Sequence, residues 1–205
     1  MAIITTYTTL QTAIGDYLNR SDLSTFLPNF TQNAEMKLYR DLRIRAMETA
    51  LSVTISSGVA TIPTSPALVQ LKYAYVDGAP VKSLDHVPPD QIYANYPVRS
   101  GAEIPRLIAM EGTNFIFGPY PGNYTIKGIY YARLTPLSGS NLTNWFTTNA
   151  TDALLYGSLL EAAPFLKDDP RIPMWQIAFD MAIKSIKAEE TRARNSGGSI
   201  AARPA

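Results

Sequence analysis

The spacing of apolar residues predicts two helices within the first 45 residues. Thr8 and Gln11 have capping-box spacing at the start of the first helix, and Pro28 suits the first turn of the second. Apolar residues then recur every three or four positions, as they do along the buried face of an amphipathic helix. These positions are Tyr7, Leu10, Ile14, Tyr17 and Leu18, followed by Phe30, Ala34, Leu38 and Leu42. The polar face of the second helix is expected to carry Glu35, Lys37, Arg40, Asp41 and Arg43.

After Arg45 the pattern changes to the alternation that is typical of β-strands. Ser57–Gly58 is a turn signal that predicts a hairpin between the strands on either side of it, and Asp77–Gly78 predicts a second hairpin. Pro88 could open a short helix that continues through Tyr93. The predicted strands are Ala50–Ser56, Val59–Ile62, Leu68–Val76, Val81–Leu84, Arg106–Glu111, Asn114–Phe117 and Tyr124–Leu134.

Two further helices are predicted towards the C-terminal end. The first covers Thr151–Lys167, where Pro164 should kink the helix or tighten its last turn. The second runs from about Pro173 to Arg194, after a break at Asp168–Asp169–Pro170. The predicted buried positions are Leu155, Leu159, Ala163 and Leu166 in the first helix, and Trp175, Phe179, Ala182 and Ile186 in the second.

This order of elements predicts an α+β protein. Residues 1–45 and 138–194 are expected to pack together as a helical bundle, because each helix has an apolar face to bury. Residues 46–137 are expected to form a β-rich central insertion between the two helical segments. Residues 195–205 are expected to form an extended C-terminal tail, because this segment has little to bury.

The composition is that of a globular protein. Of 205 residues, 46% are hydrophobic and 17% are charged, which excludes wholesale disorder. Without cysteine the chain has no disulfide, thiolate zinc site or cysteine nucleophile. A formal net charge of +1 argues against a general nucleic-acid binder. No apolar run approaches the roughly 18 residues that cross a bilayer, and the N-terminus does not look like a signal peptide, so we expect no membrane partner.

Few side chains offer catalytic chemistry. His86 has Ser83 and Asp85 nearby in sequence, but adjacent residues rarely meet in triad geometry, so a surface loop is the simpler interpretation. Paired carboxylates could support glycoside hydrolysis, although on helices they also form ion-paired surfaces. The candidate pairs are Glu35 with Asp41, Glu161 with Asp168, and Glu189 with Glu190. Calcium-loop and phosphate-loop spacings are absent, so we expect no catalytic residue, metal or cofactor.

The two remaining features concern binding. Tyrosines gather in the last predicted strands, where they could stack sugars or bases, or pack across strands. They are Tyr120, Tyr124, Tyr130 and Tyr131. The C-terminal end is basic, with five cations against Glu189 and Glu190. These cations are Lys184, Lys187, Arg192, Arg194 and Arg203. They could favour the negative end of the helix dipole, or contact an acidic partner surface or DNA phosphates.

One block of the sequence carries a family resemblance. Asn144–Trp145–Phe146, the helix Ala153–Asp169 and then Trp175 resemble the head-to-tail adaptor, or head-completion, family of short-tailed and related tailed bacteriophages. The stretches around Phe30–Glu35, Val76–Gly78 and Phe117–Pro121 are similar to the family in the same order. The resemblance therefore spans nearly the whole chain, and only the segment after Asn195 lies beyond it.

The resemblance implies a structural, non-enzymatic virion protein, assembled in the host cytoplasm. It would form a dodecameric ring that links the portal protein to tail nozzle or tail-fibre proteins and continues the channel for passing genomic DNA. The basic end then suggests portal contacts at Arg192, Arg194, Ile200 and Arg203, and DNA-channel contacts at Lys184 and Lys187. Residues 195–205 are expected to become ordered on the portal. The alternatives are a virion-associated muramidase that uses Glu35 and Glu161, and a tail carbohydrate-binding module that uses the tyrosines.

Overall fold

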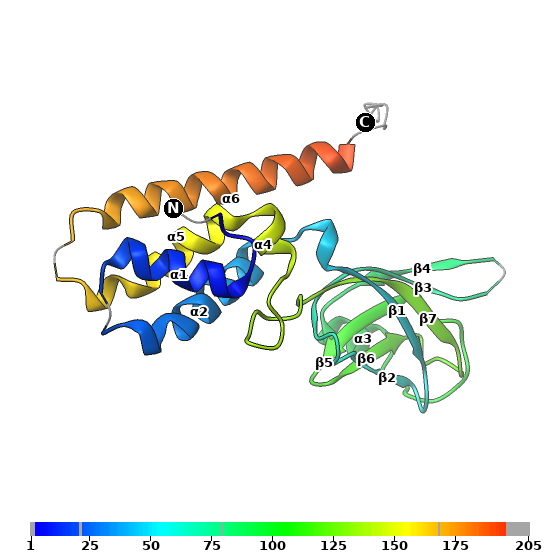
Figure 1. Ribbon diagram of the computed structural model, residues 1–205. Coiled ribbons are helices and arrows are strands. Elements are labelled where there is room, and N and C mark those ends of the chain that lie inside the picture. Colours follow the sequence, from blue (N-terminus) through cyan, green and yellow to red (C-terminus); the bar gives the residue numbers. More distant parts are fainter. Residues whose placement is uncertain (1–2, 21, 79, 168, 196–205) are drawn as a thin grey trace. The chain divides into compact units, whose positions relative to one another are not determined.

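The computed structural model describes residues 3–20, 22–78, 80–167 and 169–195 (Figure 1). The chain divides into two compact units. One unit consists of residues 1–46 together with residues 134–205 and is helical, and the other consists of residues 47–133 and is built around a sheet.

The described residues of the helical unit form five α-helices from the two ends of the chain. They are α1 (Tyr7–Leu18), α2 (Leu27–Asp41), α4 (Trp145–Asn149), α5 (Thr151–Ala162) and α6 (Ile172–Asn195). Short 3₁₀ turns are η1 (Ser24–Phe26), η3 (Ala163–Phe165) and η2 (Arg45–Met47), and η2 contains the last two residues of the first helical segment and the first residue of the sheet unit. The turn η3 contains Pro164, so the prediction that this proline tightens the end of the helix is confirmed.

The capping box of α1 lies two residues before the predicted one. The Thr6 hydroxyl accepts a hydrogen bond from the Thr9 backbone N–H, and the Thr9 hydroxyl accepts one from the Thr6 N–H. The expected pair Thr8 and Gln11 was wrong because a threonine at the third helical position replaces the usual Glu or Gln as acceptor.

The centre of the helical unit is α5, which packs against α2, α6 and α1. Gly157 makes this close packing possible, since a methyl group there would lie 3.0 Å from the Phe179 ring and 3.2 Å from the Ala34 Cβ atom. The predicted buried positions of α6 are confirmed, because Trp175, Phe179, Ala182 and Ile186 are all buried. Helix α5 itself is apolar around most of its circumference, as expected for a helix that is enclosed by others.

Residues 47–133 form a seven-stranded sheet with the strand order β1-β7-β3-β4-β5-β6-β2. Neighbouring strands are antiparallel except for β4 and β5, which are parallel. A bridge between Ser56 and Val59 joins the two ends of this order, so the mixed sheet is nearly closed. The strands are β1 (Glu48–Thr54), β2 (Val59–Thr61), β3 (Leu68–Val76), β4 (Lys82–His86), β5 (Leu107–Glu111), β6 (Asn114–Gly118) and β7 (Thr125–Ala132), with the short helix α3 (Pro89–Asn95) after β4.

The predicted fold class was wrong. The protein is α+β overall, but it is not a helical bundle that carries a β-rich central insertion, because the central residues close into a sheet with its own core. The hairpin expected at Ser57–Gly58 does not extend, since β1 pairs with β7 and β2 pairs with β6. These partners lie far apart in the sequence, so local alternation could not identify them. The second predicted hairpin, β3 with β4, is confirmed.

The core of the sheet is formed by aliphatic and aromatic residues from all seven strands, β1 to β7, and from an adjoining turn. The largest are Leu51, Ile55, Leu84, Ile108, Phe115, Phe117, Ile126 and Tyr130. Burial of these side chains is the main stabilising contribution to the unit, because each buried aliphatic or aromatic side chain contributes about 1.5–3 kcal/mol.

Gly128 is the position of this sheet that least tolerates a side chain. A Cβ atom there would clash with the Tyr73 carbonyl oxygen and lie 2.9 Å from the Ala74 Cα atom, and both are backbone atoms of β3 that cannot rotate away. We therefore expect Gly128→Ala to lower the free energy of unfolding by about 1–3 kcal/mol.

Denaturant unfolding followed by circular dichroism measures this difference. Gly78→Ala is the matched control, because nothing lies within 4 Å of a Cβ atom at Gly78. We expect the control to stay within about 0.5 kcal/mol of the parent chain. Equal stability of the two variants would contradict the close approach of β7 and β3.

Candidate partner-binding site on the helical unit

The most strongly buried carboxylate of the helical unit is Glu35. It was expected on the polar face of α2, but its side chain is 1% exposed, so that expectation was wrong. Adjacent residues of α2 are buried in pairs along one face of the helix, and Glu35 forms one such pair with Ala34. Its carboxylate accepts the backbone N–H of Leu137 at 3.1 and 3.3 Å and the side-chain amide of Asn144 at 2.6 Å.

These hydrogen bonds connect α2 to the start of α4. While the Asn144 amide nitrogen donates to Glu35, the Asn144 side-chain oxygen accepts from the N–H groups of Phe146 and Thr147 at 3.0 and 3.3 Å. Asn144 therefore caps α4 in an orientation that Glu35 fixes. The Tyr39 hydroxyl adds a second connection by donating to the Leu134 carbonyl at 3.1 Å. Together these contacts hold the segment 134–144 against α2.

The environment of Glu35 gives it a structural role. Burial raises the pKa of the Glu35 carboxyl, and the hydrogen bonds from Leu137 and Asn144 only partly oppose that rise. A carboxyl that is enclosed in this way cannot reach a polysaccharide in this conformation. Glu161, the second residue of the muramidase hypothesis, forms an ion pair with Lys37 instead.

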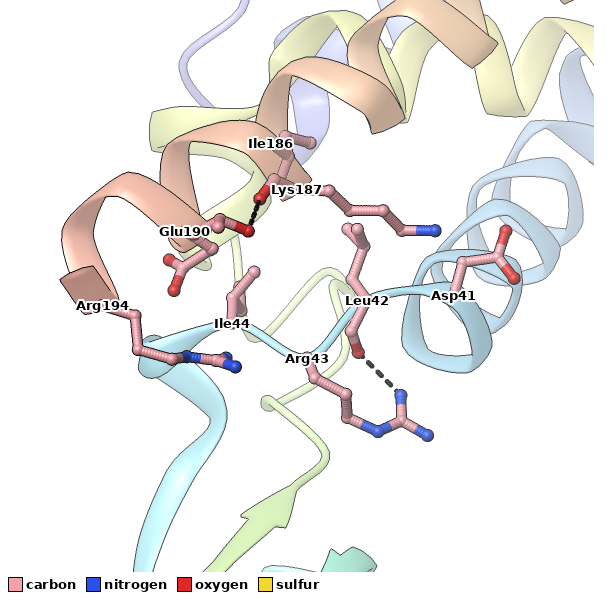
Figure 2. Close-up of a pocket in the computed structure, with 9 residues that line it drawn as sticks. Asp41, Leu42, Arg43, Ile44, Ile186, Lys187, Glu190 and Arg194 are labelled. Carbon is pink, nitrogen blue, oxygen red and sulfur yellow. Dashed lines mark hydrogen bonds between the residues drawn. The ribbon is translucent and has the colours of Figure 1, made fainter. Parts of the chain in front are cut away.

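A cavity of about 300 Å³ lies between the end of α2 and the second half of α6 (Figure 2). We call it the α2–α6 notch, and it is lined by Asp41, Leu42, Arg43, Ile44, Ile186, Lys187, Glu190, Thr191 and Arg194. Its apolar floor is buried, and the charged groups surround that floor. Three of these side chains are cationic and two are carboxylates, so the notch carries a small excess of positive charge.

Two charged groups of the notch are held in place by the protein. The Arg43 guanidinium donates to the carbonyl groups of Leu42 and Tyr39 at 2.7 and 2.8 Å, and it thereby satisfies the last turn of α2. The Glu190 carboxylate accepts the Arg45 backbone N–H at 3.1 Å. These groups form fixed walls, while the exposed side chains of Lys187 and Arg194 extend from α6 beside them (Figure 2).

The structure separates the basic residues that the sequence grouped together. Lys187 and Arg194 are seven residues apart on α6, so they lie on one side of the helix and both line the notch. Lys184 and Arg192 are exposed and lie on the outer side of α6, away from its buried stripe.

The other sequence predictions for this surface have different outcomes. Ile200 and Arg203, and Asp168 of one carboxylate pair, lie outside the described residues. Sequence reasoning missed the contribution of Asp41 and Arg43 to the notch, because nothing in the local pattern indicates that the end of α2 meets α6.

The other candidate residues lie in the sheet unit, which consists of residues 47–133. His86 is the exposed last residue of β4, where its backbone pairs with Ile108, so it is not in the expected loop. Tyr130 and Tyr131 are buried, and the Tyr130 hydroxyl donates to the Pro66 carbonyl. The Arg99 guanidinium lies over both the Tyr120 ring and the Tyr93 ring, at 5.2 and 5.5 Å from their centroids. These tyrosines are therefore engaged within the unit.

The residues that the structure describes contain no metal-binding cluster and no membrane-spanning helix. In that part of the chain, no group of three or more His, Cys, Asp or Glu residues is arranged to hold a metal ion. None of the helices within it is both long enough and apolar enough to cross a membrane.

Comparison with known proteins relates this chain to a family of adaptor proteins. A family model described as the SU10 adaptor protein matches residues 5–203 of this chain. No curated protein matches it.

The buried Glu35 generates a prediction about pH. The pKa of the Glu35 carboxyl is higher in the folded protein than its ordinary value of 4.5. The carboxyl therefore contributes most to the free energy of unfolding below pH 4.5, where it is protonated. This contribution is lost as the pH rises through the raised pKa. Glu35→Gln cannot ionise, so it should remove this decline in stability. It should also lower the free energy of unfolding by about 1–2 kcal/mol, because one of the two donors loses its acceptor.

Unfolding curves recorded between pH 4 and pH 8 test both effects. Glu189→Gln, at an exposed position of α6, is the control and should follow the parent chain at every pH. A variant at Glu35 with the parent's stability and pH profile would show that the carboxylate does not hold segment 134–144.

Proposed function

Because this chain belongs to the SU10 adaptor protein family, we propose that it forms a ring that links the phage portal to the tail and continues the DNA channel. The family is one of phage head–tail adaptors, so the chain is a structural component of the virion that interacts with other head and tail proteins. Ring formation, the contact with the portal and the continued DNA channel are what we propose in addition to that family assignment.

The observation that carries the proposal is the extent of the family match. It covers residues 5–203, and therefore both the helical unit and the sheet unit. A match of this extent supports a role for the whole chain rather than for a grafted active site. The buried position of Glu35 and the ion pair of Glu161 with Lys37 favour this structural role over the muramidase alternative.

The proposed function also specifies how the protein assembles. The ring has twelve copies, assembles in the host cytoplasm, and meets the portal on one side and tail nozzle or tail-fibre proteins on the other. Residues 1–45 and 138–194 form its helical core, residues 46–137 form the part that contains the sheet, and residues 195–205 reach the portal. The ring encloses the path of genomic DNA during ejection, and it has no catalytic role.

The α2–α6 notch supports a portal contact at the basic end of α6. Lys187 and Arg194 both line this cavity, and its Leu42 and Ile44 floor offers an apolar surface beneath the charges. An acidic side chain on a partner segment is the group that such a site would accept. Arg192, Ile200 and Arg203 are the further portal contacts, and Lys184 is a contact with the DNA channel. Because Lys187 lines the same cavity as Arg194, we assign Lys187 to the portal contacts instead of the DNA-channel contacts.

Charge reversal in the notch tests this contact. We expect the double variant Lys187→Glu, Arg194→Glu to bind purified portal protein at least about tenfold more weakly than the parent chain, because attraction becomes repulsion at a partly enclosed site. Binding of the parent chain should also weaken as the salt concentration rises.

Quantitative co-sedimentation with the portal measures both effects. Lys82→Glu reverses an exposed charge on β4 of the other unit and is the matched control, which we expect to bind as the parent does. Portal binding that survives reversal in the notch would contradict the notch as the contact, and absence of portal binding by the parent chain would contradict the proposed function.

A further inference from the structure

The sheet unit has a cavity of about 260 Å³ beside the loop that follows α3. We call this cavity the Tyr96 pocket, and all of its lining residues belong to residues 47–133, so it lies within one compact unit. Its lining combines apolar surface with two aromatic rings and several polar side chains. Five of the lining residues carry hydrogen-bonding groups, and they are Asn95, Tyr96, Ser100, Glu103 and Tyr120.

The fold does not use these hydrogen-bonding groups. Within the described part of the chain, the side chains of Asn95, Ser100 and Glu103 make no hydrogen bond or ion pair, and all three are exposed. The hydroxyl groups of Tyr96 and Tyr120 make no hydrogen bond there either. Ligand sites typically combine apolar and aromatic walls with a few polar groups that converge on one cavity. The Tyr96 pocket has this composition, and its polar groups are available to a ligand.

The walls of the Tyr96 pocket are held in place by the sheet. The Arg99 guanidinium donates to a carbonyl group of β6 at 2.8 Å and lies 5.2 Å from the centroid of the Tyr120 ring. The Glu103 backbone N–H donates to the Tyr120 carbonyl at 3.1 Å. Tyr96 packs against Gly118, where a Cβ atom would lie 2.7 Å from the tyrosine ring. A ligand would therefore meet groups that are already positioned, which lowers the entropic cost of binding.

The charges at the Tyr96 pocket favour a neutral ligand. The carboxylate of Glu103 repels phosphates and other anions. The Arg99 guanidinium over the Tyr120 ring disfavours a second cation at that ring. A proline-rich segment is a neutral ligand of many aromatic grooves, but its imide nitrogens offer the Glu103 carboxylate no donor. A neutral molecule with many hydroxyl groups meets these requirements, because each hydroxyl both donates and accepts.

We propose that the Tyr96 pocket binds one neutral sugar ring of a polysaccharide. Sugar hydroxyls donate to the Glu103 carboxylate and exchange hydrogen bonds with the Asn95 amide and the Ser100 hydroxyl. The apolar faces of the sugar ring pack against the aromatic side chains of the pocket. The cavity of about 260 Å³ lies just below the roughly 300–1,000 Å³ of sites that enclose drug-sized ligands, so it suits a single ring of a longer chain.

This binding site goes beyond the proposed ring and does not depend on it, because every residue that lines it belongs to the sheet unit. It also differs from the site that the tyrosine pattern of the sequence suggested. Of those four tyrosines, Tyr130 and Tyr131 are buried, and Tyr120 is the one that lines the Tyr96 pocket. The polar groups of the pocket come mainly from the loop after α3, where the sequence shows no periodic pattern.

Saturation-transfer NMR with the full chain and a panel of neutral oligosaccharides tests the proposal. The panel contains oligomers of glucose, galactose, mannose and N-acetylglucosamine. We expect at least one of them to bind with a dissociation constant of about 1 mM or tighter. The double variant Asn95→Ala, Glu103→Ala should bind that sugar at least about tenfold more weakly, because two hydrogen-bonding groups are lost and one of them is charged. Both side chains are exposed, so the variant should fold as the parent chain does.

The double variant Asp90→Ala, Gln91→Ala is the matched control, because it removes a carboxylate and an amide from exposed positions of α3 outside the pocket. We expect this control to bind the sugar as the parent does. Absence of saturation transfer to every sugar of the panel would overturn the proposal, and so would equal binding by the parent and the Asn95→Ala, Glu103→Ala variant. Stronger binding of an oligoproline peptide, or of an acidic oligomer of glucuronic acid, than of any neutral sugar would also overturn it.

Discussion

The close packing of α2 and α6 onto α5 at Gly157 is the contact on which the helical unit depends. The Ala34 Cβ atom and the Phe179 ring approach the position where a larger residue would carry its side chain. Three segments from opposite ends of the sequence are thereby held together, although residues 47–133 lie between them in the chain. The pairing of β1 with β7 makes this connectivity possible, because it brings the first and last strands of the sheet unit side by side (Glu48 opposite Tyr131).

The buried carboxylate of Glu35 is a second consequence of this packing. Once α2 is pressed against α5, its buried face includes a polar residue, and that residue must find donors. Leu137 and Asn144 provide them, so the polar group determines where the chain re-enters the helical unit and where α4 begins. Apolar packing thus holds the unit together, and one polar side chain specifies how its second half joins the first.

Local pattern in the sequence predicted the helices better than the sheet. The stripe of Trp175, Phe179, Ala182 and Ile186 could be identified because a long helix repeats its period many times. The strand order could not, since β1 pairs with β7 across most of the sheet unit and nothing local encodes that partner. The candidate site was predicted only in part: Lys187 and Arg194 were named as basic residues, but the walls that Arg43 and Glu190 provide depend on long-range packing. Glu35 was misplaced for the same reason, because its donors lie far along the chain.

The account that we propose is that this adaptor assembles as a ring on the portal through the basic end of α6, and it rests on the family assignment and on the α2–α6 notch. The most direct test is native mass spectrometry of the chain alone and after mixing with the portal protein of the same phage. The account predicts that portal particles gain twelve chains of 22.5 kDa as one cooperative step. Portal particles whose mass is unchanged, or that gain isolated copies without closing a ring, would contradict it.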